Sequence, residues 1–241
     1  MRKHNVRLFS LVFILLTTAL SFLCYTEQPT TNIQTIVFDF GGVVAKADDT
    51  RIKTFLMNSF KIDRKELGIA LKTMREKIGE DISEEDYWKR YATSRGIQLP
   101  NNWFLQYSTI ITESIEEIPG SIAIVKALQA RKYQTAMLSD VTQKQTDIIR
   151  QLGYYDLFNP VILSCDTGIK KPNSKAFQVL LQRLNQSPSA VLFIDDRIEN
   201  VEAAKKEGID SIQFISPKQL KQELEERGIE CNSESFYDVL Q

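Results

Sequence analysis

The sequence contains a single histidine, His4, among 241 residues. Because His4 lies at the very start, the rest of the chain contains no histidine. This absence excludes Ser-His-Asp and Cys-His catalysis, zinc sites built on histidine, and chemistry through a phosphohistidine. Any reaction at this chain must therefore use carboxylates, amines, hydroxyls or a metal held by oxygen.

The sequence also has few cysteines and a net charge close to zero. The three cysteines, Cys24, Cys165 and Cys231, form neither a disulfide framework nor a zinc spacing. With a formal net charge of −1, the chain lacks the excess of basic residues that is typical of nucleic-acid-binding proteins, so we predict no nucleic-acid partner. The length fits one domain, or one domain that carries a large insert.

The first residues form a separate segment, with a basic start and an apolar run from Leu8 to Leu23. That pattern is typical of a secretory signal or a short signal anchor. Ala19 and Ser21 fit the −3 and −1 positions of a cleavage site, while 16 apolar-run residues are slightly short for a membrane span. We therefore predict a signal peptide or signal anchor over residues 1–26, with a membrane tether through residues 8–23 if it is retained. The protein would then be exported, to the periplasm or the extracellular space, or anchored, and a cytoplasmic location is less favoured.

Five short apolar runs have the character of strands that are buried on both faces of a parallel sheet, because they lack polar alternation. They are Thr35–Phe38, Thr135–Leu138, Val161–Leu163, Val191–Ile194 and Ser211–Phe214. Helical patterns lie between most of them. Strands that alternate with helices predict an α/β fold, a doubly wound parallel Rossmann-like sheet with five core strands.

The gap between the first two strands is far too long for a single crossover. It contains several helical stretches and no convincing strand. We interpret residues 46–118 as an inserted α-helical cap. The core domain then comprises residues 33–45 and 119–228, and residues 229–241 form a C-terminal tail.

Polar residues stand at or just beyond the ends of four of the predicted strands. They are Asp39 after the first, Ser139 and Asp140 at the second, Lys171 beyond the third, and Asp195 and Asp196 at the fourth. The carboxyl ends of parallel strands meet at one edge of the sheet, where ligands bind. We therefore expect these side chains to converge on one site.

This set of side chains suits chemistry at phosphorus. A carboxylate can attack as a nucleophile and form an aspartyl-phosphate, and it needs a cation because two anions must approach each other. Magnesium takes oxygen ligands and keeps several waters, so a few carboxylates suffice to hold it. The turn at Gly41 and Gly42 exposes backbone N–H groups that favour an oxyanion.

The same segments resemble the four motifs of the haloacid dehalogenase-like hydrolase superfamily, in the subgroup with a helical cap after the first motif (subfamily IA, C1 cap). Phe38–Val43 resembles motif one, Ser139 motif two and Lys171-Pro172 motif three. Asp195-Asp196, followed by Asn200 and Gly208, resembles motif four. The resemblance covers residues 33–228 and implies a phosphatase that acts on a small phosphorylated metabolite. We predict a monomer or homodimer.

The resemblance also implies a role for each matching residue. Asp39 would be the nucleophile and a Mg²⁺ ligand, with Asp196 and the Gly41 carbonyl as further ligands. Asp195 would bind the metal through water or orient Lys171, which serves as the charge clamp. The residues that would hold the phosphoryl group are Phe40, Gly41, Ser139, Asp140 and Lys171.

One position departs from the pattern, because phosphatases of this superfamily usually carry a second Asp where Gly41 stands. A positioned acid–base is typically worth about 10²–10⁴ in rate. Three interpretations are open. Water or the substrate supplies the proton and catalysis is slow, or Asp48 or Asp49 substitutes, or the site has lost hydrolysis.

Other interpretations compete with the phosphatase. The chain could be a weakly catalytic or non-catalytic module that binds a phosphorylated ligand at the membrane. Dehalogenation of a 2-haloacid ranks lower, because dehalogenases of this group bind no metal and lack the pair Asp195-Asp196. Each residue also has a plainer role, with Ser139 as a helix cap and Lys171 as a solvated surface residue.

Overall fold

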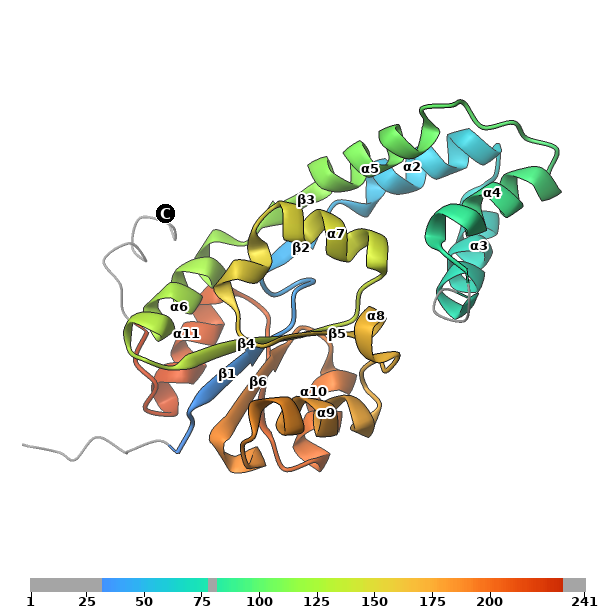
Figure 1. Ribbon diagram of the computed structural model, residues 1–241. Coiled ribbons are helices and arrows are strands. Elements are labelled where there is room, and N and C mark those ends of the chain that lie inside the picture. The colour runs from blue at the N-terminus through green and yellow to red at the C-terminus, as the bar shows by residue number, and fades with distance from the viewer. Residues whose placement is uncertain (1–31, 78–81, 232–241) are drawn as a thin grey trace, which may run out of the picture. The chain divides into compact units, whose positions relative to one another are not determined.

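The computed structural model describes residues 32–77 and 82–231. Their central feature is a parallel sheet in the order β5-β4-β1-β6-β7 (Figure 1). Its strands are β1 (Thr35–Phe38), β4 (Gln134–Ser139), β5 (Val161–Leu163), β6 (Val191–Asp195) and β7 (Asp210–Gln213). Every neighbouring pair in this sheet runs parallel. The predicted doubly wound α/β sheet with five core strands is confirmed.

Helices cover both faces of the sheet and bury its apolar side chains. On one face, α6 (Pro119–Ala130) and α11 (Pro217–Glu226) contribute to the larger apolar core. On the other face, α9 (Ser174–Leu184) and α10 (Ile198–Lys206) contribute to a second apolar core. All four residues of β1 are buried, as expected for a central strand covered on both sides. Two short elements, η1 (Tyr154–Leu157) and α8 (Ser164–Thr167), flank β5, and η2 (Pro188–Ala190) precedes β6.

The insert between β1 and β4 is a group of helices with its own apolar core. Its helices are α2 (Asp49–Phe60), α3 (Arg64–Lys77), α4 (Glu84–Ser94) and α5 (Trp103–Ser114). Leu56, Phe60 and Trp88 are fully buried among them. We call this group the cap.

Two strands that the sequence analysis did not predict connect the cap to the sheet domain. β2 (Ala45–Ala47) pairs antiparallel with β3 (Ile115–Glu117), and Asp48 N–H and Ile118 N–H extend the ladder at its two ends. The expectation of no strand in the insert is therefore wrong. Each strand has only three residues, two of them exposed in β2, so neither forms an apolar run or an alternating pattern long enough to recognise.

Helix α7 (Gln143–Gln151) belongs to the sheet domain but contacts the cap as well. Its adjacent isoleucines face different cores. Ile148 packs into the apolar core of the cap and Ile149 packs into the larger core of the sheet domain. The helix begins at a capping box in which Thr142 and Gln145 exchange hydrogen bonds.

The prediction of an exported or membrane-anchored protein requires correction. None of the helices in residues 32–77 and 82–231 is long and apolar enough to cross a membrane. The predicted signal segment, residues 1–26, and its tether, residues 8–23, lie outside the described residues. The prediction of location is therefore withdrawn.

Candidate active site

The candidate site lies where β1, β4 and β6 end, at the centre of the sheet. β1 pairs with β4 on one side and with β6 on the other, so the chain order reverses at β1. Such a switch point leaves a crevice outside the carboxyl ends of the strands. Asp39 follows β1 directly, and its backbone N–H donates to the Ile194 carbonyl at 2.9 Å. This bond fixes the first residue of the loop against β6.

Lys171 joins two of the carboxylates. Its Nζ donates to Asp39 Oδ1 at 2.8 Å, to Asp195 Oδ2 at 2.7 Å, and to the Leu138 carbonyl at 2.9 Å. An ammonium has three N–H donors, and all three are used here. Lys171 is only 6% exposed, so the interpretation as a solvated surface residue is wrong.

Burial and charge act in opposite directions on these groups. Burial alone would lower the pKa of Lys171, but the Asp39 and Asp195 carboxylates hold that pKa above its ordinary value. Burial is also the main influence on Asp39 and raises its pKa to about 6. Lys171 opposes this rise and Asp195 adds to it. The site is thus a buried cluster in which one ammonium holds two carboxylates together.

Asp195 is fully buried, and its carboxylate accepts four hydrogen bonds from three donor groups. Besides Lys171, the Arg197 backbone N–H donates to Oδ1 at 2.9 Å. Asn200 Nδ2 lies 2.9 Å from Oδ1 and 3.0 Å from Oδ2. Asn200 is itself buried at the start of α10. The sequence analysis placed Asn200 in motif four without giving it a role, although its position five residues after Asp195 in that motif was a usable signal.

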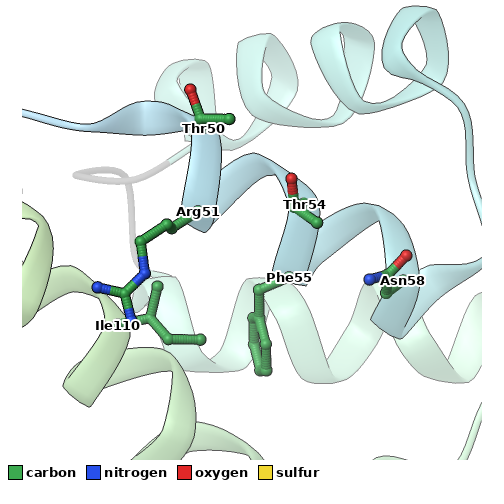
Figure 2. A pocket seen from close by; sticks show the side chains of 6 residues that line it. All are labelled: Thr50, Arg51, Thr54, Phe55, Asn58 and Ile110. Carbon is green, nitrogen blue, oxygen red and sulfur yellow. The ribbon is translucent and has the colours of Figure 1, made fainter.

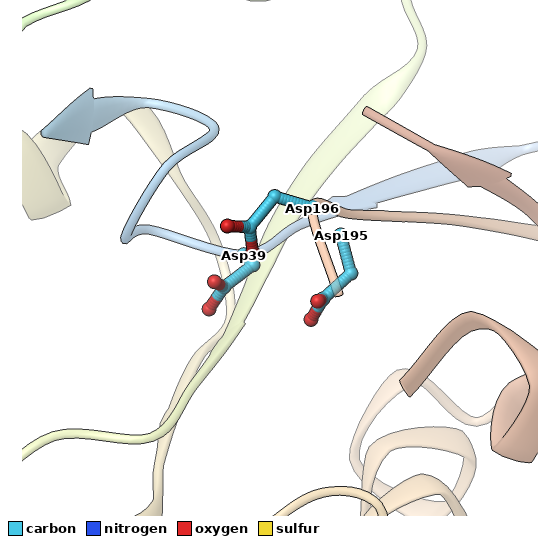
Figure 3. Close-up of side chains that lie close together, drawn as sticks. All are labelled: Asp39, Asp195 and Asp196. Atoms are coloured by element: carbon cyan, nitrogen blue, oxygen red, sulfur yellow. The ribbon is translucent and has the colours of Figure 1, made fainter. Parts of the chain in front are cut away.

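Three carboxylates of the site lie close enough to hold a metal ion together. One oxygen from each of Asp39, Asp195 and Asp196 lies within 4.8 Å of the others (Figure 3). Asp196 is the most exposed of the three, and no side chain of another described residue donates a hydrogen bond to its carboxylate. With Lys171 as the nearby cation, three negative charges face one positive charge. Oxygen donors with an excess of negative charge fit a hard divalent cation such as Mg²⁺.

The loop after β1 adapts to this cluster through its second glycine. Gly42 has a φ of 77°, and a Cβ added there would lie 2.5 Å from Asp196 Oδ2. The backbone N–H groups of Val44 and Ala45 turn back to the Phe40 carbonyl at 2.9 and 3.1 Å. A side chain at Gly42 would therefore displace the Asp196 carboxylate.

Two further residues predicted to bind phosphate, Ser139 and Asp140, lie at the end of β4 and directly after it. Ser139 is buried at the end of the strand, and Asp140 Oδ1 accepts a hydrogen bond from the Lys171 backbone N–H at 3.1 Å. Burial raises the pKa of Asp140. The Val141 N–H donates to Ser164 Oγ at 3.0 Å. Two neighbouring loops, after β4 and after β5, are thus tied together beside Lys171.

Comparison with protein families gives one assignment. A model of the haloacid dehalogenase-like hydrolases matches residues 33–208, which include every predicted site residue. The chain belongs to this hydrolase family. The predicted family and the prediction of a hydrolase are confirmed.

Among curated relatives of this hydrolase, a phosphoglycolate phosphatase from Aquifex aeolicus is 25% identical over 190 residues, covering 73% of this chain and 82% of that protein. A glyceraldehyde 3-phosphate phosphatase from Pyrococcus furiosus is 29% identical over 113 residues, or 46% of this chain and 47% of that protein. The mouse acyl-CoA dehydrogenase family member 10 is 22% identical over 83% of this chain, which spans only 20% of that protein.

Solved structures agree on the fold of the hydrolase. A haloacid dehalogenase family enzyme from Bacteroides thetaiotaomicron superposes with a TM-score of 0.65 at 19% identity, covering 76% of this chain and 94% of that one. The same enzyme in complex with magnesium and inorganic phosphate gives a TM-score of 0.63 at 18% identity, covering 76% of this chain and 95% of that one.

Asp48 and Asp49, the proposed substitutes for an acid–base at Gly41, both lie at the start of α2. Asp48 N-caps α2 and accepts from the Thr50 N–H at 2.9 Å, and this bond lowers the pKa of Asp48, opposite to what a general acid needs. Asp49 pairs with Lys53 at 2.9 Å on the exposed surface of α2. Both carboxylates therefore already have structural partners.

A hollow of about 320 Å³ lies in the cap, on the surface between α2 and α5 (Figure 2). It is lined by Thr50, Arg51, Thr54, Phe55, Asn58 and Ile110. None of these residues belongs to the four motifs. The hollow is thus a feature of the cap and not part of the carboxylate cluster.

Proposed function

We propose that this hydrolase is a magnesium-dependent phosphatase that hydrolyses a small phosphomonoester through an aspartyl-phosphate at Asp39. The observation that carries the proposal is the contact of Lys171 with Asp39 and Asp195 at 2.8 and 2.7 Å. A buried ammonium beside the nucleophile reduces the repulsion between a carboxylate and an incoming phosphate, and it acts strongly because water is excluded.

In the first half of the reaction, a carboxylate oxygen of Asp39 forms a bond to phosphorus while the bond to the leaving oxygen breaks. Lys171 occupies Asp39 Oδ1 and so holds the carboxylate in one orientation. The proposed contacts for the phosphoryl oxygens are the Ser139 hydroxyl and backbone N–H groups of Phe40, Gly41 and Asp140. Water or the substrate would supply the proton for the leaving oxygen, since Gly41 has no side chain to give it.

In the second half, water attacks phosphorus, phosphate leaves, and the Asp39 carboxylate is regenerated. Asp39, Asp196 and the Gly41 carbonyl would hold Mg²⁺, whose chemistry at this position is to neutralise charge on the phosphoryl group. Asp195 is proposed to orient Lys171, because its oxygens already accept from Lys171, Asn200 and the Arg197 backbone.

Two of the curated relatives support the substrate class. They are named for phosphoglycolate and glyceraldehyde 3-phosphate, both small phosphomonoesters. We propose that the substrate of this hydrolase is also a small phosphorylated metabolite. The predicted monomer or homodimer stays a prediction.

The test is hydrolysis of para-nitrophenyl phosphate by the full chain, with Mg²⁺ and with chelator. Asp39→Asn is expected to abolish both turnover and acid-stable labelling of the protein by the phosphoryl group, because it removes the nucleophile. Asp147→Asn, an exposed carboxylate on α7, serves as the matched control and is expected to keep wild-type activity. Turnover that persists in Asp39→Asn, or in chelator, would overturn the proposal.

The alternative is a weakly catalytic or non-catalytic phospho-ligand-binding module, and Gly41 is the observation that favours it. A chain of this kind would bind inorganic phosphate with Mg²⁺ but show no turnover at high protein concentration. A phosphoaspartate that accumulates at Asp39 without hydrolysis would place the chain between the two, because the second step needs a base to activate water.

A further inference from the structure

Glu84, the first residue of α4, links the interior of the cap to the sheet domain through its carboxylate. Glu84 Oε1 accepts from the Tyr107 hydroxyl at 2.6 Å, and Oε2 accepts from the Thr142 hydroxyl at 3.2 Å. Tyr107 is buried in the cap core, whereas Thr142 is the N-cap of α7 in the sheet domain. One carboxylate therefore joins the two parts of the molecule, at a place far along the chain from β2 and β3.

Thr142 stands directly after the short loop that follows Ser139, the last residue of β4, and that contains Asp140. The Val141 N–H and carbonyl both bond to Ser164 Oγ, at 3.0 and 3.3 Å. Asp140 is tied to the Lys171 backbone at 3.1 Å. The loop thus has anchors inside the sheet domain at Asp140 and Val141, and its anchor to the cap is at Thr142.

The Thr142 hydroxyl has one hydrogen and two acceptors within reach, Glu84 Oε2 and Gln145 Oε1, each at 3.2 Å. A carboxylate is the stronger acceptor, and Gln145 Oε1 already accepts from the Thr142 backbone N–H at 3.1 Å. Donation to Glu84 is therefore favoured. The hydroxyl oxygen remains free to accept from the Gln145 N–H, so the bond to Glu84 and the capping box are compatible.

We propose that Glu84 is a positioning residue that holds the cap against α7 in the substrate-binding arrangement. This inference rests on the proposed phosphatase function. Ile148 contributes a non-directional apolar contact between the same two parts, while the bond from Thr142 to Glu84 sets their register. If only the docked arrangement binds substrate well, apparent affinity falls with the fraction of molecules that are docked.

The experiment compares two substitutions at Thr142 in the full chain. Asn and Asp are equally good N-caps, so both variants keep the start of α7. Thr142→Asn retains an N–H donor for Glu84, whereas Thr142→Asp removes the donor and places a second carboxylate against it. With para-nitrophenyl phosphate and Mg²⁺, KM is expected to rise about 3- to 10-fold in Thr142→Asp with little change in kcat, and to stay near wild type in Thr142→Asn.

A reciprocal change separates positioning from simple damage to the loop. In the double variant Thr142→Asp, Glu84→Gln, the carboxamide can donate to the new carboxylate, so KM is expected to return toward wild type. A structural defect at Thr142 would lower kcat and would not be rescued. Equal KM values in Thr142→Asp and Thr142→Asn, or failure of the rescue, would overturn the proposal.

Hydrogen exchange of residues 83–94 and 143–151 gives a readout that needs no turnover. Exchange is expected to increase in Thr142→Asp and to return in the double variant. If the wild-type chain has no phosphatase activity while exchange behaves as expected, the proposed function fails and the contact between cap and sheet domain stands. If the wild-type chain is an active phosphatase but hydrogen exchange is unchanged in Thr142→Asp, the proposed role of Glu84 fails and the proposed function stands.

Discussion

Gly41 is the residue at which this hydrolase departs from its family pattern, and the structure leaves room for the missing side chain. A Cβ added at Gly41 would meet no atom within 4 Å, and the backbone there is not left-handed. Its neighbour Gly42 is the opposite case, with a φ of 77° and the Asp196 carboxylate in the way. The two glycines of one turn thus have different tolerance for substitution.

Gly41→Asp is expected to raise kcat for para-nitrophenyl phosphate by about 10²-fold, the lower end of what a positioned acid–base supplies. Steady-state kinetics at saturating Mg²⁺ measure the change. Gly42→Ala, the matched control, is expected to lower activity because its Cβ would displace Asp196. An unchanged kcat in Gly41→Asp would mean that another group already transfers the proton.

Asn200 received no role in the sequence analysis, and in the structure its amide nitrogen donates to both oxygens of Asp195. Asn200→Asp would place a fourth carboxylate in a buried cluster that has one ammonium. The free energy of unfolding is expected to fall by about 3 kcal/mol, as for other uncompensated buried charges.

Urea denaturation in chelator measures this loss, and Asn173→Asp provides the comparison. Asn173 caps α9 on the surface, where Asp serves equally well, so the same chemical change should be neutral there. Equal stability of the two variants would show that Asp195 does not depend on the Asn200 amide.

At the scale of elements, α7 is shared between two apolar cores. Ile148 and Ile149 are 4% and 3% exposed, yet one contacts the cap and the other the sheet domain. An amphipathic pattern indicates which residues of a helix are buried but not which neighbour buries them. For this reason the helix could be predicted from its sequence and its contact with the cap could not.

The two isoleucines are expected to respond differently to truncation. Ile149→Ala should lower the stability of the sheet domain by about 2–5 kcal/mol, the usual range for a buried isoleucine. Ile148→Ala should instead increase hydrogen exchange in α5 while exchange in β1 and β4 stays close to wild type. The same hydrogen-exchange pattern in both variants would contradict the inference that Ile148 stabilises the cap while Ile149 stabilises the sheet domain.

At the scale of the whole molecule, the proposed binding of Mg²⁺ would increase the stability of the chain, because Asp39, Asp195 and Asp196 come from two separate strand ends. At a Mg²⁺ concentration about 100 times its Kd, the chain is expected to gain about 2.7 kcal/mol. Thermal unfolding with Mg²⁺ and with chelator measures this gain.

Asp196→Asn tests the same link between Mg²⁺ binding and stability, because the substitution is expected to have opposite effects on stability in chelator and in Mg²⁺. The variant removes one of three mutually repelling charges, so without Mg²⁺ it should be at least as stable as wild type. With Mg²⁺ it should gain much less. A full gain in Asp196→Asn would mean that Asp196 is not a ligand.

The sequence allows most of the sheet domain to be predicted, because parallel strands covered on both faces appear as continuous apolar runs. The strand ends and their motif residues follow from the same runs, as Asp39 after β1 and Asp195 at the end of β6 illustrate. The short strands β2 and β3 and the contact of Glu84 with Thr142 depend on pairings across 58 or more residues, and no local pattern encodes such pairings.

The pairing of β2 with β3 brings the two ends of the cap segment side by side, with Ala47 opposite Ile115. In topological terms the chain enters and leaves the cap at a single point, so a tight turn from Ala47 to Ile115 would close the hairpin and leave the strand order of the sheet unchanged. A different set of helices could be inserted at the same point. Such an exchange would first have to cover Ile148, the apolar side chain of the sheet domain that packs into the cap core.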